Sequence, residues 1–268
     1  MSHRDEVRGS VRTVREIPVT GVPAVVHPEW SRSFPWLVQG TTVRGGDGAF
    51  DLRLFGPDGE RWGDEAEGGL ESTPEVWGHL LRWSGCATVA HARQVHEDTV
   101  RSHEALRAPG LHLVPACDGH FTAEPGVLLA VAIADCVPVS VVDPARREVA
   151  MLHAGWRGAA AGVLERGLGV FRNRGGSLDG LHIHFGPSIC GACYEVGGKV
   201  FEAFDLPVPE RPEPIDLRAV LADRAIEAGI GADRVTVSEH CTLCGDGGFY
   251  SHRAGDVGRQ VGFLGVRP

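Results

Sequence analysis

The segment from Glu148 to Gly158 joins an apolar strand to residues that can do chemistry. Residues 149–152 are apolar, and they are followed directly by His153, a Gly-Trp-Arg-Gly turn and a run of alanines. Side chains two positions apart on a strand share a face, so His153 and Met151 point the same way. Because α/β sheets build ligand crevices at the carboxyl ends of their strands, we expect His153 to line such a crevice.

Two more residues could complete a metal site with His153. Cys136, in ADCVPV, is about as far from the centre of the turn at Asp143 to Glu148 as His153 is, so a hairpin there places the two side by side. His96, in ARQVHED, follows a short apolar stretch. Two imidazoles and one thiolate match the three-ligand count of a catalytic zinc ion that keeps its fourth position open for water.

An anion could bind next to these residues. Gly155 and Gly158 allow close backbone approach, and the first turn of the following helix offers free N–H groups. Arg157 adds a planar fork of donors at the same place. We therefore expect Arg157 and the start of this helix to bind an anion.

The surrounding elements alternate between strands and helices. Val-, Leu- and Ile-rich patterns predict strands, and alanine-rich or amphipathic patterns predict helices. The expected strands are 126–136, 137–143, 149–155, 180–189 and 233–239, and the expected helices are 73–85, 157–175 and 214–230, the last capped by Asp216. The order predicts one α/β (α+β) domain, a mixed central β-sheet flanked by helices. Residues 1–20 are expected to form a loose N-terminal extension, and residues 21–268 the single catalytic domain.

Composition narrows the function classes. The 268 residues carry a net charge of −9, which disfavours nucleic-acid partners because they require a basic surface. No apolar run is long enough for a membrane span, and the N-terminus lacks the apolar core of a signal peptide. The seven cysteines are odd in number and lack a secretory context, so a disulfide framework is disfavoured. We expect a cytoplasmic protein with small-molecule partners.

Five motifs in order resemble the YfiH/laccase-domain family of purine nucleoside phosphorylases, once described as polyphenol oxidases. They are ARQVH (92–96), ADCVPV (134–139), LHAGWRG (152–158), GPSICGACYEVG (186–197) and CTLC…FYSHR (241–253). The resemblance covers the chain from about residue 30 to its C-terminal end.

The resemblance implies a zinc ion held by His96, Cys136 and His153, with water or hydroxide in the fourth position. It implies phosphorolysis of adenosine, inosine and S-methyl-5'-thioadenosine to base and sugar 1-phosphate, with adenosine deaminase activity alongside. Arg157 is the first candidate for the phosphate, and Arg44 and Arg253 are lesser ones.

The chain departs from the family pattern at two places. Glu97 follows His96 where glycine is usual, so a different loop backbone is expected there. TTVRGG replaces the usual TTR-x-GG, which weakens the assignment of Arg44 to the phosphate. Neither change falls on an expected metal ligand.

Other chemistries fit parts of the sequence. A copper-dependent polyphenol oxidase could use the same three ligands with Met151 as axial ligand, but only His182 and His184 resemble the paired histidines that a multicopper enzyme needs. The nucleobase deaminase signature begins with HPE (27–29), yet its second half is not present. Cys136 with His153 also matches the nucleophile pair of a cysteine hydrolase.

A non-catalytic structural zinc protein is the remaining alternative. Cys190-x-x-Cys193 and Cys241-x-x-Cys244 form a CxxC…CxxC set, a typical zinc signature. The 47 residues between the two pairs exceed the usual spacing, so we expect these cysteines to pack in the core or line the pocket.

Overall fold

The computed structural model describes most of the chain. The described residues are 11–46, 50–55, 68–69, 74–104, 106, 108–245 and 248–268. Residues 1–10 of the expected N-terminal extension lie outside them. Residues 12–14 and 17–18, expected in that extension, instead form strands that pair with the body of the domain, so the expectation of a loose segment is wrong for this part.

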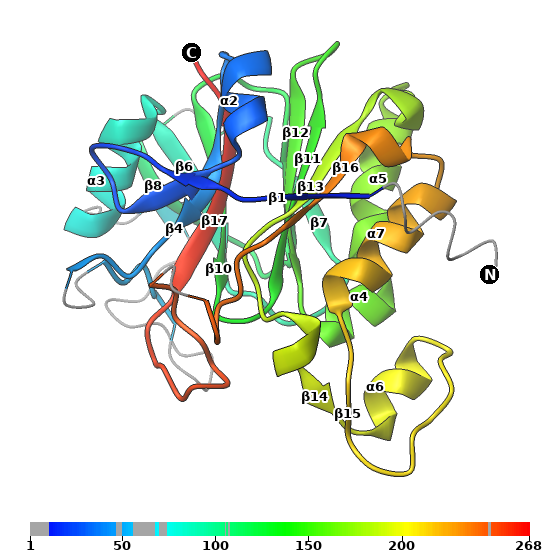
Figure 1. Ribbon diagram of the computed structural model, residues 1–268. Coiled ribbons are helices and arrows are strands. Elements are labelled where there is room, and N and C mark those ends of the chain that lie inside the picture. Colours follow the sequence, from blue (N-terminus) through cyan, green and yellow to red (C-terminus); the bar gives the residue numbers. More distant parts are fainter. Residues whose placement is uncertain are drawn as a thin grey trace.

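Two mixed β-sheets form the centre of the fold (Figure 1). In spatial order, the first sheet contains β1 (Arg12–Val14), β16 (Val235–Ser238), β13 (His182–Phe185), β11 (Val137–Asp143), β12 (Glu148–Ala154), β9 (Gly119–Thr122) and β7 (Val100–Ser102). The second contains β2 (Ile17–Pro18), β3 (Ala24–Val26), β4 (Leu37–Thr42), β17 (Gln260–Val266), β10 (Val127–Ile133), β6 (Thr88–Ala92), β8 (Gly110–Val114) and β5 (Gly68–Gly69). The predicted mixed α/β class is confirmed, with two sheets where one central sheet was expected.

Helices cover the outer faces of both sheets. The described helices are α2 (Pro28–Ser33), α3 (Glu75–Ser84), α4 (Trp156–Ala161), α5 (Val163–Asn173), α6 (Gly198–Ala203) and α7 (Leu217–Glu227). A small hairpin pairs β14 (Glu195–Val196) with β15 (Glu213–Pro214). In Figure 1, α4, α5 and α7 lie beside the first sheet and α3 lies beside the second, while α6 and the β14–β15 hairpin project from one end.

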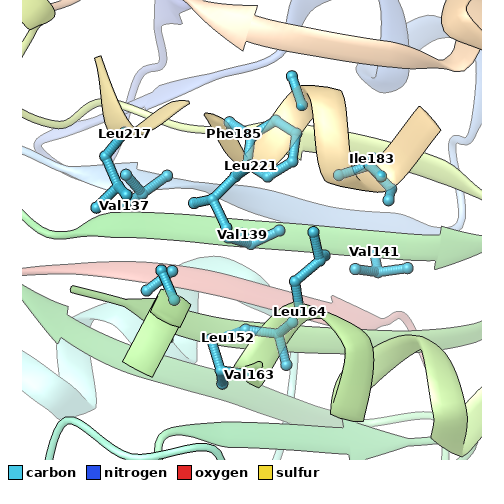
Figure 2. Packing of buried hydrophobic residues seen from close by; sticks show 14 of the residues in the cluster. Val137, Val139, Val141, Leu152, Val163, Leu164, Ile183, Phe185, Leu217 and Leu221 are labelled. Carbon is cyan, nitrogen blue, oxygen red and sulfur yellow. The ribbon is translucent and has the colours of Figure 1, made fainter. Parts of the chain in front are cut away.

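Strand β11 is buried on both of its faces. Figure 2 shows Val139 and Val141 packed with Leu164 and Leu221, on the side covered by α5 and α7. Val142 instead belongs to a second core cluster together with residues of β10 and β17. Burial on both faces requires a nearly continuous apolar strand rather than an alternating one, which explains the pattern VPVSVVD.

The hairpin between β11 and β12 forms as predicted. The side chain of Asp143 closes the turn, because its Oδ1 accepts hydrogen bonds from the backbone N–H groups of Ala145 (3.0 Å) and Arg146 (3.1 Å). The resulting register places Pro138 opposite His153. The end of β11 next to Cys136 therefore lies beside the end of β12 that carries His153.

The helix expected over residues 157–175 is divided into α4 and α5. Gly162 separates them with a φ of 97°, a left-handed conformation that ends α4. The expected cap of α7 is confirmed, since Asp216 accepts hydrogen bonds from the N–H groups of Arg218 and Ala219. Among the described residues, no helix combines the length and apolar character needed to cross a bilayer.

Candidate metal centre

The structure brings His96, Cys136 and His153 together from three separate segments. His96 lies in the loop after β6, Cys136 lies between β10 and β11, and His153 lies near the end of β12. Their potential ligand atoms all lie within 4.8 Å of one another. His153 is buried, Cys136 is half-buried and His96 is exposed, so the cluster is accessible from the side of His96.

Close packing by glycine allows these side chains to meet. A Cβ atom on Gly155 would lie 2.9 Å from Sγ of Cys136 and 3.0 Å from Cδ2 of His96. A Cβ atom on Gly158 would lie 2.9 Å from the carbonyl oxygen of Glu97. Contacts this short exclude any side chain at either position unless the neighbouring atoms move, so the glycines of the HAGWRG segment shape the cluster.

Asp118, which the sequence analysis did not identify, orients two of the three residues. Its Oδ1 lies 2.8 Å from Nδ1 of the buried His153. The same carboxylate accepts hydrogen bonds from the consecutive backbone N–H groups of Val95, His96 and Glu97, at 3.0, 2.9 and 3.0 Å. One buried side chain therefore fixes the His153 ring and the loop that carries His96. An acidic residue within the apolar stretch LHLVPACDGHF is the signal that could have revealed it.

Glu97 is compatible with this loop. The left-handed residue of the loop is His96, with a φ of 61°, and Glu97 is not among the residues with positive φ. The backbone N–H of Glu97 binds Asp118 as a glycine N–H would. The departure from the family pattern at this position therefore leaves the loop ordered around Asp118.

Electrostatics in the cluster favour a thiolate. Burial raises the pKa of Cys136, but the neighbouring His153 and His96 outweigh burial and lower it to about 6. Burial lowers the pKa of His153, but Cys136 and Asp118 outweigh burial and raise it to about 9. A deprotonated cysteine is the form that binds metal ions and acts as a nucleophile, so Cys136 is suited to either role.

A cavity of about 590 Å³ opens onto the cluster. Its volume lies within the range of small-molecule sites. The lining includes apolar, cationic and imidazole side chains: Arg53, Leu54, Phe55, His91, Ala92, Arg93, Gln94, Val95, His96, Ala132, Ala134, Cys136, His153, His252, Val257 and Arg259. Three of these residues are arginines that were not expected at the site: Arg93 lies within the ARQVH motif, whereas Arg53 and Arg259 belong to no motif quoted above.

The three arginines expected at an anion site have different surroundings. Arg157 is exposed, and its guanidinium lies 4.5 Å from the ring centre of Trp156. Arg44 is bound to Asp256 and to the carbonyl oxygen of Phe249, both at 2.6 Å. None of the three lines the 590 Å³ cavity.

Arg253 is tied to the backbone near the cysteine-rich segment. Its guanidinium donates hydrogen bonds to the carbonyl oxygens of Cys193 (3.4 Å) and Glu195 (3.1 Å). Arg44 and Arg253 thus both have partners within the protein. Of the three, Arg157 has the guanidinium that is most open to a ligand.

The residues that suggested copper oxidase or nucleobase deaminase chemistry have structural partners away from the cluster. His184 is buried and bonded to Glu16 (2.8 Å) and to the Thr236 hydroxyl (3.0 Å). His27 forms the N-cap of α2. Met151 packs in the core between the sheets, and its sulfur accepts a hydrogen bond from Ser140.

Comparison with known proteins identifies relatives over most of the chain. A family model described as multi-copper polyphenol oxidoreductase laccase matches residues 71–267. Purine nucleoside phosphorylase YlmD of Geobacillus stearothermophilus is 34% identical over 203 residues, which cover 70% of this chain and 73% of that protein. Adenosine deaminase RL5, from an unknown prokaryotic organism, is 34% identical over 161 residues, 56% of this chain and 61% of that protein.

Solved structures share the fold. The crystal structure of YlmD from Geobacillus stearothermophilus superposes with a TM-score of 0.75 and 26% identity, covering 95% of this chain and 100% of that one. The crystal structure of Neisseria meningitidis protein NMB0706 gives a TM-score of 0.69 over 87% of this chain and 95% of that one, at 24% identity. The second likeness shows the fold alone.

Proposed function

Because this chain is an enzyme of the multi-copper polyphenol oxidoreductase laccase family, we propose that it is a zinc-dependent purine nucleoside phosphorylase with adenosine deaminase activity. Its substrates would be adenosine, inosine or S-methyl-5'-thioadenosine, which it would split with phosphate into base and sugar 1-phosphate. The convergence of His96, Cys136 and His153 beside a cavity of substrate size carries the proposal. The same proposal makes it a cytoplasmic enzyme of small molecules, without nucleic-acid or membrane partners.

The three residues fit a zinc ion. Zinc prefers imidazole nitrogen at about 2.0–2.1 Å and thiolate sulfur at about 2.3 Å, which places ligand atoms about 3.5 Å apart. The ligand atoms here lie within 4.8 Å of one another, so small side-chain rotations would close the site. When bound, zinc supplies Lewis-acid chemistry that lowers the pKa of water towards about 7 and so provides a nucleophile for deamination.

Asp118 supports this arrangement by fixing a proton. The carboxylate, 2.8 Å away, accepts the proton of Nδ1 of His153, so a metal ion would take the place of the second ring proton at Nε2. Because Asp118 also binds the N–H groups of residues 95–97, the positions of His96 and His153 are coupled through one side chain. A carboxylate that holds the second ring nitrogen of a histidine in this way is typical of histidines that bind metal ions.

The cavity and Arg157 would bind the two substrates. Phe55 and Leu54, which line the cavity together with the cluster, offer apolar surface for a purine ring. Arg157 follows the close turn at Gly155 and would hold the phosphate, because the planar guanidinium can donate two hydrogen bonds to phosphate oxygens. Arg44 and Arg253 are already bonded within the protein, so we assign the phosphate to Arg157 before them.

Zinc is favoured over copper by the surroundings of Met151. In a blue-copper site, methionine is the common weak axial ligand beside two histidines and a cysteine. The Met151 sulfur instead accepts a hydrogen bond from Ser140 in the core between the sheets, and His184 is bonded to Glu16. Neither is available to build a copper oxidase around this cluster.

A second candidate function is a cysteine hydrolase. The lowered pKa of Cys136 and the raised pKa of His153, each caused chiefly by the other once burial is overcome, describe a thiolate–imidazolium pair. Metal content separates the two candidates, since a hydrolase would keep its activity after the metal is removed.

The direct test is an assay of the purified protein. With adenosine and phosphate we expect adenine and ribose 1-phosphate, and with adenosine alone we expect inosine and ammonia. Both activities should disappear after treatment with a chelator and return with zinc. Phosphate-independent release of adenine, or full activity in metal-free protein, would contradict the proposal.

A further inference from the structure

Four cysteines outside the candidate metal centre form a second cluster. The Sγ atoms of Cys190, Cys193, Cys241 and Cys244 all lie within 4.8 Å of one another. All four are free thiols, and Sγ of Cys190 lies 3.9 Å from Sγ of Cys244. Cys241 is buried, Cys190 and Cys193 are half-buried, and Cys244 is exposed.

The fold explains how two distant pairs meet. Strands β13 and β16 are parallel neighbours, with Ile183 opposite Val235. The first cysteine pair follows β13 and the second follows β16, so both pairs lie beyond the carboxyl ends of two neighbouring strands. An isolated bridge between Ser188 and Cys241 continues the pairing up to the cluster. The 47 residues between the two pairs, which argued against a common site, contain most of the connection from β13 to β16 and β16 itself.

The backbone around Cys241 is arranged for a negatively charged sulfur. Its Sγ accepts hydrogen bonds from the N–H groups of Cys190 (3.2 Å), Leu243 (3.4 Å) and Cys244 (3.5 Å). N–H donors stabilise the charged form of the group that they contact. Two of these donors belong to other members of the cluster, so the loops are folded around the sulfur atoms.

We propose that Cys190, Cys193, Cys241 and Cys244 bind a second zinc ion, a structural one. Four thiolates at about 2.3 Å from a tetrahedral zinc ion lie about 3.8 Å apart, and the distance between Cys190 and Cys244 already matches this value. Four cysteines leave no open position, which is the arrangement of structural zinc sites. The proposal does not depend on the activity proposed for the first centre.

The second site would also hold the turn that carries Cys136. Thr242, between the last two cysteines, donates a hydrogen bond to Oδ1 of Asp135 at 2.6 Å. Ile189, next to Cys190, donates its N–H to the carbonyl oxygen of Asp135 at 3.1 Å. Asp135 has a φ of 83°, a strained conformation for a residue with a side chain. Both loops of the cluster therefore hold Asp135, and Cys136 comes next in the chain.

Metal content of matched variants tests the proposal. We expect two zinc equivalents per chain in the unaltered protein and one each in C136A and C193S. The control C86A changes a buried cysteine in a separate core cluster and should keep two equivalents. One equivalent in the unaltered protein that C193S retains, or two equivalents in C193S, would overturn the second site.

X-ray absorption of C136A tests the same site without altering it. If this variant retains zinc only at the cysteine cluster, its spectrum should show four sulfur neighbours at about 2.3 Å. Nitrogen or oxygen neighbours, or an iron edge, would overturn the assignment. In chelator and denaturant without reductant, all seven cysteines should react with a thiol reagent; fewer would indicate a disulfide instead of a metal.

Zinc affinity at the first centre tests the connection through Asp135. In C193S we expect the affinity of the remaining zinc ion to fall by about tenfold, the lower end of the effect of losing contacts that support a metal ligand. An affinity equal to that of the C86A control would overturn the connection. This readout is measured by chelator competition and requires no catalytic activity.

Discussion

Asp118 and His153 form a buried pair in which Oδ1 of the carboxylate lies 2.8 Å from Nδ1 of the imidazole. Both residues are shielded from solvent, with His153 2% exposed and Asp118 fully buried. Through three further hydrogen bonds Asp118 also holds the loop of His96. The geometry of the candidate centre thus depends on a residue that is not itself a ligand.

Replacing Asp118 with asparagine should weaken the first centre. An amide offers one acceptor oxygen and no charge, so it cannot hold both the His153 proton and three N–H groups. We expect zinc affinity at this centre to fall about 10- to 100-fold, the usual effect of losing an outer-shell partner. Chelator competition measures it, and D98N, at an exposed ion pair with Arg166, is the control. Equal affinities in the two variants would show that Asp118 does not support the site.

Replacing Gly155 with alanine should disturb the ligands while the fold persists. The new Cβ would lie within about 3 Å of Cys136 and His96, so one of the two side chains must move. We expect at least a tenfold loss of activity together with weaker zinc binding. In G169A the added Cβ meets no atom within 4 Å, and alanine is the better helix former, so activity should be unchanged and stability equal or higher. Full activity in G155A would contradict the close packing described here.

Replacing Arg157 with alanine should affect phosphate selectively. The loss of one charge-assisted contact corresponds to about a tenfold increase in KM for phosphate. Zinc content and the deamination of adenosine should change little, because Arg157 is not part of the metal cluster. R172A, at an exposed arginine of α5, is the control. An unchanged KM for phosphate in R157A would show that another cation binds the phosphate, such as Arg93 or Arg259 of the cavity.

His91 should make the stability of the protein depend on pH. Burial lowers the pKa of His91 from 6.5 to about 4, while its hydrogen bond with the carbonyl oxygen of Ala130 opposes the shift. The folded protein therefore resists protonation of His91 more than the unfolded chain does. The stability is complete above pH 6.5 and declines as pH falls from 6.5 to about 4, by up to about 3 kcal/mol.

The variant H91Q removes this titration. Its free energy of unfolding, measured by denaturant titration of metal-free protein, should fall less than that of the unaltered protein between pH 6.5 and 4. H79Q changes an exposed histidine of α3 and should retain the original slope. If H91Q and H79Q show the same slope, the burial of a neutral His91 does not contribute to acid sensitivity.

Local sequence patterns were sufficient to predict contacts between residues that are close together in the chain. The hairpin at Asp143 places Cys136 and His153 together because antiparallel strands joined by a short turn have a fixed register. The Asp216 cap could be predicted for the same reason, because a capping side chain contacts only the next turn.

Contacts between distant segments were the ones that the sequence did not reveal. Asp118 meets His153 because β9 pairs with β12, and no local pattern specifies that pairing. The cysteine pairs meet because β13 and β16 are parallel neighbours, which linear spacing cannot show. Arg44 and Arg253 were lesser candidates for the phosphate, and the partners that bind them come from residues far along the chain.

The central claim is that one metal ion held by His96, Cys136 and His153 is required for turnover. The most direct test measures zinc content and phosphate-dependent release of adenine in C136A, with C86A as the control. We predict that C136A loses one zinc equivalent and nearly all turnover, while C86A retains both. Normal turnover by C136A after loss of that zinc would contradict the account.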